Sequence, residues 1–280
     1  MNVFFDIFFF ANLTKTIKSI VVNFRLYFFM IEVTLIGTGR LSFNLMNEIL
    51  NNKRFKLNQV FGRSKFRPKH ISDDVDHIKE IKNINKSDFY LIAVSDNEIY
   101  NVSNQFDAKE GIVLHVSGNT NINVLSNHKN YGVFYPLQTF SYETNLNFRE
   151  IPIIIEANNK INQKKIEKFS KIFSKKVCKM SSNERAICHL SATIANNFTN
   201  HLVFKAEQIL EKNGIDKKIL QPLIKETFNK LDRMTTSEAQ TGPALRNDNL
   251  TIESHLRQLN ESDFLNLYKE ITKSIRSNEL

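Results

Sequence analysis

The sequence predicts an α/β fold, with a doubly wound, mostly parallel sheet in its N-terminal part and an all-α C-terminal domain. Short apolar runs rich in β-branched residues alternate with helical patterns as far as residue 181, as in consecutive βαβ units. The first of these runs ends in a glycine turn. From residue 182 onward, apolar residues recur only at helical spacing. We therefore predict two domains, residues 30–181 and residues 182–280.

The glycine turn follows the first predicted strand, residues 33–36. A helical pattern comes directly after the turn, so strand, turn and helix open a βαβ unit of the Rossmann type. Gly37 allows a tight turn, and Gly39 lets the helix N-terminus approach a pyrophosphate. Ser42 stands where the fingerprint has its third glycine, and an ordinary strand–turn–helix is the alternative interpretation. The candidate cofactor-binding residues here are Gly37, Thr38, Gly39, Arg40 and Leu41.

The second predicted strand, residues 57–61, is followed by a basic segment. Folds that bind NAD carry an acid about 20 residues past the glycines, where it binds a ribose hydroxyl. This sequence has Arg63 and Ser64 there, with Lys65 and Arg67 close behind, and no acid. A guanidinium and a hydroxyl suit a 2′-phosphate, which an acid would repel. The segment favours NADP(H) over NAD(H), and a solvated basic loop is the alternative.

Two more predicted strands, residues 89–94 and 112–116, end in polar residues, after a segment (68–86) predicted to hold a short helix and a short strand. Ligands of open α/β sheets bind at the carboxyl ends of the strands. The alternative is ordinary turn chemistry. His115 alternates with apolar neighbours and is predicted to be a core histidine. The candidate cofactor-binding residues at these strand ends are Val94, Ser95, Asp96, Ser117 and Gly118.

The sheet domain is predicted to end with three strands and a helix. The strands are residues 131–140, 151–157 and 176–180, and the helix covers about residues 162–174. The helical domain then begins with a long helix from residue 182 to about residue 213, which Gly214 ends. Further helices are predicted over 217–231, 251–259 and 262–277.

Polar residues gather at two places in this helical domain. His189, Thr193 and Asn197 fall at i, i+4 and i+8 of the long helix and so share one face of an α-helix. They either form a satisfied network or line a cleft. Arg246 and Asp248 follow a rigid Gly-Pro turn, where the arginine could clamp a carboxylate or phosphate. An Arg–Asp pair within an interhelix loop is the alternative.

The composition indicates which classes of binding partner are favoured. Hydrophobic residues make up 41% and charged residues 24%, as in a soluble globular protein. The net charge of +9 is spread along the chain, so nucleic-acid binding is not favoured, because its usual footprint is a concentrated patch. Cys178 and Cys188 build no disulfide framework or zinc spacing, which indicates a reducing cytoplasm and no metal site.

Residues 1–29 differ from the rest of the chain. They are rich in Phe, but charged residues interrupt them, and no run is long enough to span a bilayer. We expect either that the protein starts at Met30 or that these residues are a disordered tail, and a membrane-surface helix is a further alternative. No membrane partner is predicted.

Six segments, in this order, resemble one bacterial family: GTGRLS, LIAVSDNEI, LHVSGNT, YPLQTF, HLSATIANNFTNHL and TGPALRNDNLTIESHL. Its members join a Rossmann-like NADP-binding domain to a helical domain of unknown function. The family lies in the superfamily of 6-phosphogluconate dehydrogenases, ketopantoate reductases and pyrroline-5-carboxylate reductases. The likeness covers residues 30–280. It implies an NADP-dependent reductase and a homodimer with interlocked helical domains, the helical domain serving dimerisation and substrate binding.

In the better-known relatives, a helix lysine with asparagines one and two turns further on serves the substrate. The resemblance places His189 at the lysine position and Thr193 at the next, while Asn197 keeps the asparagine. A histidine can donate a proton to a carbonyl or imine near neutral pH. The candidate catalytic residues are therefore His189, Asn197 and Thr193. The candidate substrate-binding residues are Gln138, Arg246 and Asp248.

Two classes of function follow from this resemblance. The first is an oxidoreductase in which NADPH reduces the C=O or C=N bond of a small substrate, which is acidic if Arg246 binds it. The second is a non-catalytic NADP-binding sensor or scaffold protein that has lost the lysine together with its chemistry.

Overall fold

The computed structural model describes residues 30–64, 68–142, 146–259 and 263–277. The expectations for residues 1–29, and for Lys65 and Arg67, lie outside the described residues. Two compact units make up the described chain, and the division between them falls between Thr193 and Ile194. The domain boundary predicted from the sequence lies earlier, between residues 181 and 182, so that the helix over residues 182–192 falls on the other side of it. That boundary stays a prediction.

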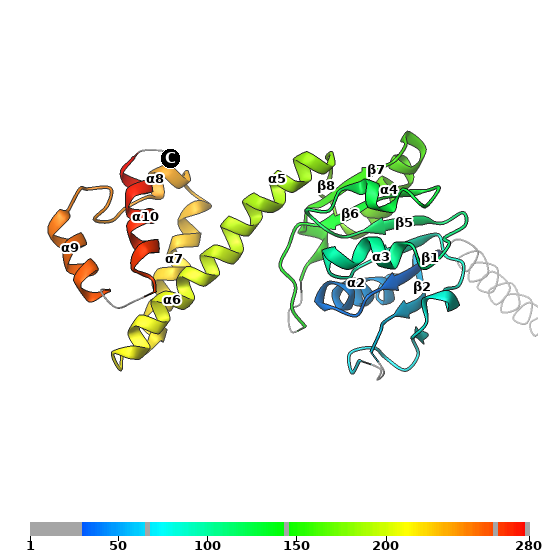
Figure 1. The fold of residues 1–280 in the computed structure, drawn as a ribbon, viewed down its shortest axis with the longest axis horizontal. Coiled ribbons are helices and arrows are strands. Elements are labelled where there is room, and N and C mark those ends of the chain that lie inside the picture. The colour runs from blue at the N-terminus through cyan, green and yellow to red at the C-terminus, as the bar shows by residue number, and fades with distance from the viewer. Residues whose placement is uncertain (1–29, 65–67, 143–145, 260–262, 278–280) are drawn as a thin grey trace, which may run out of the picture. The chain divides into compact units, whose positions relative to one another are not determined.

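The first unit contains one eight-stranded sheet (Figure 1). Its strand order is β3-β2-β1-β4-β5-β6-β7-β8. All neighbouring strands are parallel except β6 and β7, which are antiparallel. The fold class predicted from the sequence is confirmed. The strands are β1 Ile31–Ile36, β2 Phe55–Phe61, β3 His77–Ile78, β4 Phe89–Ile92, β5 Ile112–His115, β6 Tyr131–Pro136, β7 Ile153–Ala157 and β8 Val177–Lys179.

Helices cover both faces of the sheet because alternate strand residues are apolar on both sides. Leu35 of β1 packs in one core with α2 (Arg40–Leu50) and α4 (Lys160–Phe173). The next residue, Ile36, packs in a second core with α3 (Ile99–Ser103). The short α3 was not predicted from the sequence.

The chain reverses its direction of travel across the sheet between β1 and β4. From β1 it moves outward to β2 and β3, and it then crosses back to β4 on the other side of β1. Such a switch point leaves a crevice at the carboxyl ends of the two central strands, where ligands of this fold class bind. The predicted glycine turn and the residues after β4 meet at this point.

The predicted long helix is not one continuous α-helix. It contains α5 (Ser182–Ala192), a π-helix η5 (Thr193–Phe198) and α6 (Thr199–Lys212). The Thr199 hydroxyl donates to the carbonyl oxygen of Ile194, five residues back, at 3.5 Å. A hydroxyl that bonds the preceding turn competes with the backbone, and π-helical turns accommodate the wider spacing. The expectation of an α-helical i, i+4, i+8 face is therefore wrong beyond Thr193.

The second unit is all-helical, as predicted. Positive φ angles at Gly214 (+69°) and Gly242 (+113°) mark two of its turns. The elements after α6 are η6 Lys217–Leu220, α7 Gln221–Leu231, α8 Thr236–Ala239, α9 Asn249–Gln258 and α10 Leu265–Arg276.

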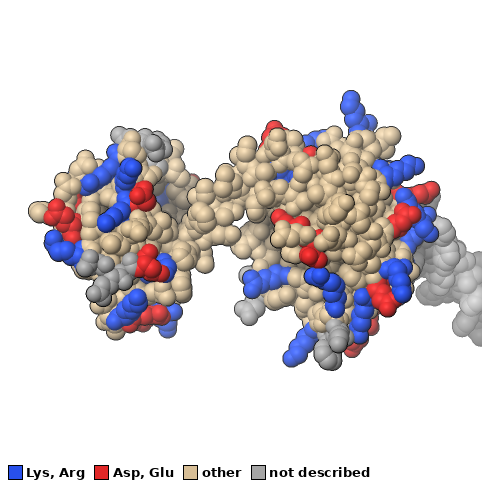
Figure 2. Space-filling model, in the orientation of Figure 1, with Lys and Arg blue, Asp and Glu red and all other residues tan. Residues whose placement is uncertain are grey.

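Charge is mixed over the surface. On the face shown in Figure 2, Lys and Arg side chains are interspersed with Asp and Glu. No helix in the described part of the chain has the length and apolar character needed to cross a membrane.

Candidate functional site

The glycine turn fits tightly against the end of β4. Gly37 has φ +122°, a conformation that L side chains rarely adopt. A Cβ at this position would also collide with the carbonyl oxygen of Ala93. A Cβ at Gly39, in contrast, would meet no atom within 4 Å. Gly37 is therefore required for the turn itself, whereas Gly39 borders open space.

Ser42, in place of the third fingerprint glycine, has a structural role. Its side chain is buried, and its hydroxyl donates to the carbonyl oxygen of Gly37 at 2.6 Å. The serine thus ties the first turn of α2 back to the glycine turn. The amide of Asn44 donates to the carbonyl oxygen of Arg40, within α2, and to that of Ser141, in the loop after β6, both at 2.8 Å.

The N–H groups at the start of α2 donate no hydrogen bond to a capping side chain. The N-cap residue is Gly39, which has no side chain, and the first turn contains no acid. The first N–H groups of an α-helix have no partner within the helix and carry a partial positive charge. The start of α2 therefore offers donors to an anion, and a pyrophosphate fits this requirement.

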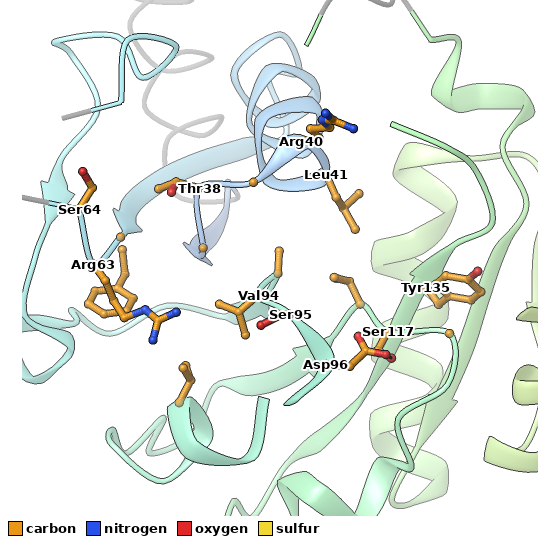
Figure 3. Close-up of a pocket in the computed structure, with 18 of the residues that line it drawn as sticks. Thr38, Arg40, Leu41, Arg63, Ser64, Val94, Ser95, Asp96, Ser117 and Tyr135 are labelled. Carbon is orange, nitrogen blue, oxygen red and sulfur yellow. Dashed lines mark hydrogen bonds between the residues drawn. The ribbon is translucent and has the colours of Figure 1, made fainter. Parts of the chain in front are cut away.

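A cavity of about 550 Å³ lies over this helix start. All twelve residues predicted to bind a cofactor line the cavity. Figure 3 shows Arg63 and Ser64 at one end of it and Tyr135 at the other, with Val94 and Ser95 between them. The structure therefore brings together four segments that are far apart in the sequence: residues 37–41, 63–64, 94–96 and 117–118.

Arg63, at the β2 end of the cavity, has a carboxylate partner. Its Nη1 donates to Glu98 Oε2 at 3.0 Å. Residues 62–67, directly after β2, contain no acid, but η2 (Asp96–Glu98), which follows β4, places one beside the arginine. The arginine side chain is largely exposed, so one face of the guanidinium stays accessible to a phosphate.

Asp96 and Ser117 join the ends of β4 and β5 inside the cavity. The Ser117 hydroxyl donates to Asp96 Oδ2 at 2.7 Å. The same hydroxyl oxygen accepts from the backbone N–H groups of Asn119 at 3.1 Å and Thr120 at 2.9 Å. These three bonds fix the loop after β5 and hold a carboxylate at the wall of the cavity.

Tyr135 and His189 form a side-chain pair at the far end of the cavity. The Tyr135 hydroxyl lies 3.0 Å from His189 Nδ1, and both residues line the cavity. Burial, followed by the nearby Cys188 and Asp96, raises the pKa of Tyr135 to about 12, so its hydroxyl keeps its proton. The sequence reasoning identified His189 and missed Tyr135. The only signal was its place near the end of a predicted strand, inside the segment YPLQTF.

Gly118 is the residue against which this pair packs. A Cβ at Gly118 would lie 2.6 Å from His189 Nδ1 and 2.7 Å from Tyr135 Cζ. Both distances are shorter than real Cβ contacts allow, so any larger residue would displace the two rings. Glycine is therefore needed here to let the tyrosine and the histidine meet.

Helix α5, which carries His189, is held firmly at its start. A capping box joins Ser181 and Glu184. The fully buried Arg185 donates through Nη1 to the Glu156 carboxylate and through Nη2 to the carbonyl oxygen of Thr120. The arginine thus connects α5 to β7 and to the loop after β5.

His115 lies in the core, as predicted. It is fully buried, and its Nδ1 accepts from the backbone N–H of Ser117 at 3.2 Å. Burial, together with the positive charge of Arg185, lowers its pKa to about 3, so the ring is neutral. Its Nε2 has no hydrogen-bond partner among the described residues.

The remaining predicted site residues do not line the described cavity. Gln138 is exposed, and its side chain accepts from the backbone N–H of Thr139. The Thr193 hydroxyl donates to the carbonyl oxygen of His189 at 2.9 Å. Asn197 and Arg246 are exposed within the second unit. Asp248 caps α9 by accepting from the backbone and the hydroxyl of Thr251, and these bonds lower its pKa.

An uncapped helix behind a glycine turn, at the switch point of a doubly wound parallel sheet, defines a Rossmann-type domain. Comparisons with known proteins identify its relatives. A family model described as a domain of unknown function, DUF2520, matches residues 151–275. No curated protein matches the sequence.

Many solved structures are similar, among them the following three. A Bacteroides fragilis protein, provisionally assigned as an NADP oxidoreductase, is 30% identical with a TM-score of 0.82, over 89% of this chain and 99% of that chain. A Thermotoga maritima protein is 21% identical with a TM-score of 0.74, over 88% and 98% of the two chains. The Plasmodium falciparum pyrroline carboxylate reductase, solved with NADP bound, is 14% identical with a TM-score of 0.57, over 88% and 98%.

The chain belongs to the family of the Bacteroides fragilis protein. Its DUF2520 match begins at residue 151, so it includes the last two strands of the Rossmann-type sheet as well as the helices that follow. The family resemblance predicted from the sequence is confirmed. The Thermotoga and Plasmodium structures share the fold.

Proposed function

We propose that the chain binds NADP(H) in the cavity of the first unit and reduces a small substrate at a C=O or C=N bond. The observation that carries this proposal is the layout of the cavity. An uncapped helix start lies at its wall, and the Tyr135–His189 pair lies at the end opposite Arg63 and Ser64. The Bacteroides relative supports the cofactor, and the Plasmodium relative, which acts on a pyrroline, a cyclic imine, supports the reaction class.

The residues of the first unit would divide the cofactor between them. The N–H groups at the start of α2 would bind the pyrophosphate, with Gly37, Thr38 and Gly39 shaping the turn. Arg63 and Ser64 would bind the 2′-phosphate, with Arg63 sharing its charge between the phosphate and Glu98. The nicotinamide would lie between these residues and His189, along the ends of β4 and β5, at Val94, Ser95, Asp96, Ser117 and Gly118.

When bound, NADPH supplies the hydride. His189 would then donate a hydrogen bond or a proton to the substrate oxygen or nitrogen. Asn197, Thr193 and Gln138 are proposed to orient the substrate, and Arg246 with Asp248 to bind an acidic group on it. These roles rest on the family resemblance, since only His189 of these residues lines the described cavity.

We further propose that the chain forms a homodimer. Ile187 and Leu190 of α5 and Ile194 and Phe198 of the π-helix η5 are each more than half exposed. No Lys, Arg, Asp or Glu occurs between residues 186 and 204. Apolar surface of this kind on a helix is typical of a partner interface. A second copy of the chain is the partner that the family resemblance implies.

One experiment separates the reductase from a non-catalytic sensor or scaffold. NADPH oxidation is measured across a panel of small carbonyl and imine compounds for wild type, H189A and the control H201A. The reductase proposal predicts turnover that H189A lowers by about 100-fold while NADPH binding changes little. Turnover equal to wild type in H189A would remove His189 from the mechanism. NADPH binding without oxidation of any compound would favour the sensor.

The cofactor preference has its own test in Arg63. R63A is expected to weaken NADPH binding about tenfold and to leave NADH binding unchanged, because one charge-assisted contact to the 2′-phosphate is lost. R54A, which changes an exposed arginine away from the cavity, is the matched control. Equal loss of both cofactors in R63A would contradict a 2′-phosphate role.

A further inference from the structure

The contact between Tyr135 and His189 restricts which nitrogen of the histidine can act. Nδ1 lies 3.0 Å from the Tyr135 hydroxyl, and the two rings meet edge to face with centroids 5.9 Å apart. No described residue makes a hydrogen bond to Nε2. One ring nitrogen is therefore occupied by the protein, and the other is available to a ligand.

The protonated Tyr135 hydroxyl can donate this hydrogen bond to the histidine. Tyr135 is buried, and its pKa, raised to about 12, keeps the phenol protonated at neutral pH. A neutral imidazole has one donor and one acceptor nitrogen, and the hydrogen bond made by one nitrogen sets the role of the other. If the phenol donates to Nδ1, the ring proton must lie on Nε2.

We propose that Tyr135 is the positioning residue for His189: its hydroxyl donates to Nδ1 and so keeps the ring proton on Nε2, the nitrogen that meets the substrate. The position of the ring proton does not depend on any reaction. That Nε2 contacts a substrate rests on the function proposed above. In that reaction, Nε2–H would be a fixed hydrogen-bond donor to the oxygen or nitrogen of the bond being reduced.

Three anchors hold the pair in this geometry. Gly118 leaves room for both rings, since its missing Cβ would lie against His189 Nδ1 and Tyr135 Cζ. The loop that carries Gly118 is fixed by the Ser117–Asp96 hydrogen bond. Arg185, one helical turn before His189, ties the helix to Glu156 and to that same loop at Thr120. A donor placed on rigid elements in this way is pre-organised for catalysis.

The test is the histidine tautomer, measured by NMR on full-length protein labelled with ¹⁵N-histidine, without cofactor, at about pH 8.5, where imidazole rings are neutral. The variant H189Q assigns the signal among the seven histidines. In wild type, we expect the proton on Nε2 and an Nδ1 resonance shifted by an accepted hydrogen bond. Y135F, which keeps the ring, should move Nδ1 to its unbonded position, and Y131F on the same strand should change nothing.

Two results would overturn the proposal: a wild-type His189 that carries its proton on Nδ1, or a Y135F spectrum identical to that of wild type. The wild-type tautomer decides the question even if Y135F does not fold. Once a substrate is known, Y135F should lower kcat about tenfold with NADPH affinity within about twofold of wild type. Failure of NADPH to bind would contradict the proposed function and leave the tautomer result standing.

Discussion

Helices α2 and α5 belong to the same unit and have the same length, 11 residues, yet they begin in opposite ways. The start of α5 is closed by a capping box and anchored by the buried Arg185. The start of α2 has a glycine N-cap and no acid in its first turn. Free backbone donors at a helix start are costly unless water or a ligand binds them. The start of α5 is therefore satisfied by the protein itself, whereas the start of α2 leaves donors for the anion that we propose binds there.

The largest effect is expected from breaking the anchor of α5. R185M leaves the Glu156 carboxylate without its buried partner and should lower the free energy of unfolding by about 3 kcal/mol. Urea unfolding of wild type and R185M measures the change. K56M, which breaks the exposed pair with Glu32, is the control and should cost about 0.5 kcal/mol or less. Equal costs in the two variants would mean that the buried pair does not anchor the helix.

Capping α2 should remove the contrast between the two helices. The backbone at Gly39, with φ −77° and ψ −177°, suits an ordinary N-cap residue. G39D is therefore expected to raise the free energy of unfolding by about 0.3 kcal/mol, since glycine is itself a fair N-cap residue. The same carboxylate should weaken NADPH binding by about 100-fold through repulsion of the pyrophosphate.

The neutral cap G39N is the matched control for this variant. It should stabilise the protein similarly while weakening NADPH binding much less than G39D does. Stability from urea unfolding and affinity from fluorescence titration are measured on the same preparations. A G39D protein that binds NADPH as wild type does would show that no anion lies at the start of α2.

The core beneath the α5 anchor should be sensitive to acid. The pKa of His115 is lowered to about 3 in the folded protein, so below about pH 6.5 the unfolded chain takes up a proton that the folded protein does not. This histidine should lower the free energy of unfolding by about 1.4 kcal/mol per pH unit as the pH falls from about 6.5.

The comparison of wild type with H115N isolates this effect, because asparagine keeps an acceptor for the Ser117 N–H and does not titrate in this range. Urea unfolding at pH 7.5, 6 and 5 should show the stability of wild type falling relative to H115N. A constant difference across the three pH values would contradict a neutral buried ring.

The smallest effect is expected from uncapping α5. S181A removes the side chain that accepts from the backbone of Glu184 and should cost about 1 kcal/mol of stability. NADPH binding should not change, because the start of α5 does not serve the cofactor. An S181A protein with weakened NADPH binding would indicate that the two helix starts do not have separate roles.

The fold and the cofactor end of the cavity were largely predictable from the sequence, because their signals are local. The glycine turn and the polar strand ends lie within a few residues of the strands that position them, and the fold class places all strand ends of the parallel part at one edge. The role of Ser42 was only partly visible, since the sequence shows a small residue and not its bond to Gly37.

The side-chain pairs of the cavity were harder to predict because they are long-range. Tyr135 meets His189 across 54 residues at one end, and Arg63 meets Glu98 across 35 at the other. No periodic pattern encodes such pairs. The π-helix after Ala192 was missed for a different reason, since hydroxyl–carbonyl bonds within a helix leave the apolar spacing unchanged.

The central claim is that the start of α2 and the Arg63 end of the cavity bind NADP(H). Titration of the purified full-length protein with NADPH and with NADH, followed by cofactor fluorescence, tests it without knowledge of the substrate. We predict saturable binding of NADPH, with an affinity about tenfold higher than that of NADH. Absence of binding for both cofactors up to about millimolar concentration, a range in which cofactor-binding sites saturate, would contradict the claim.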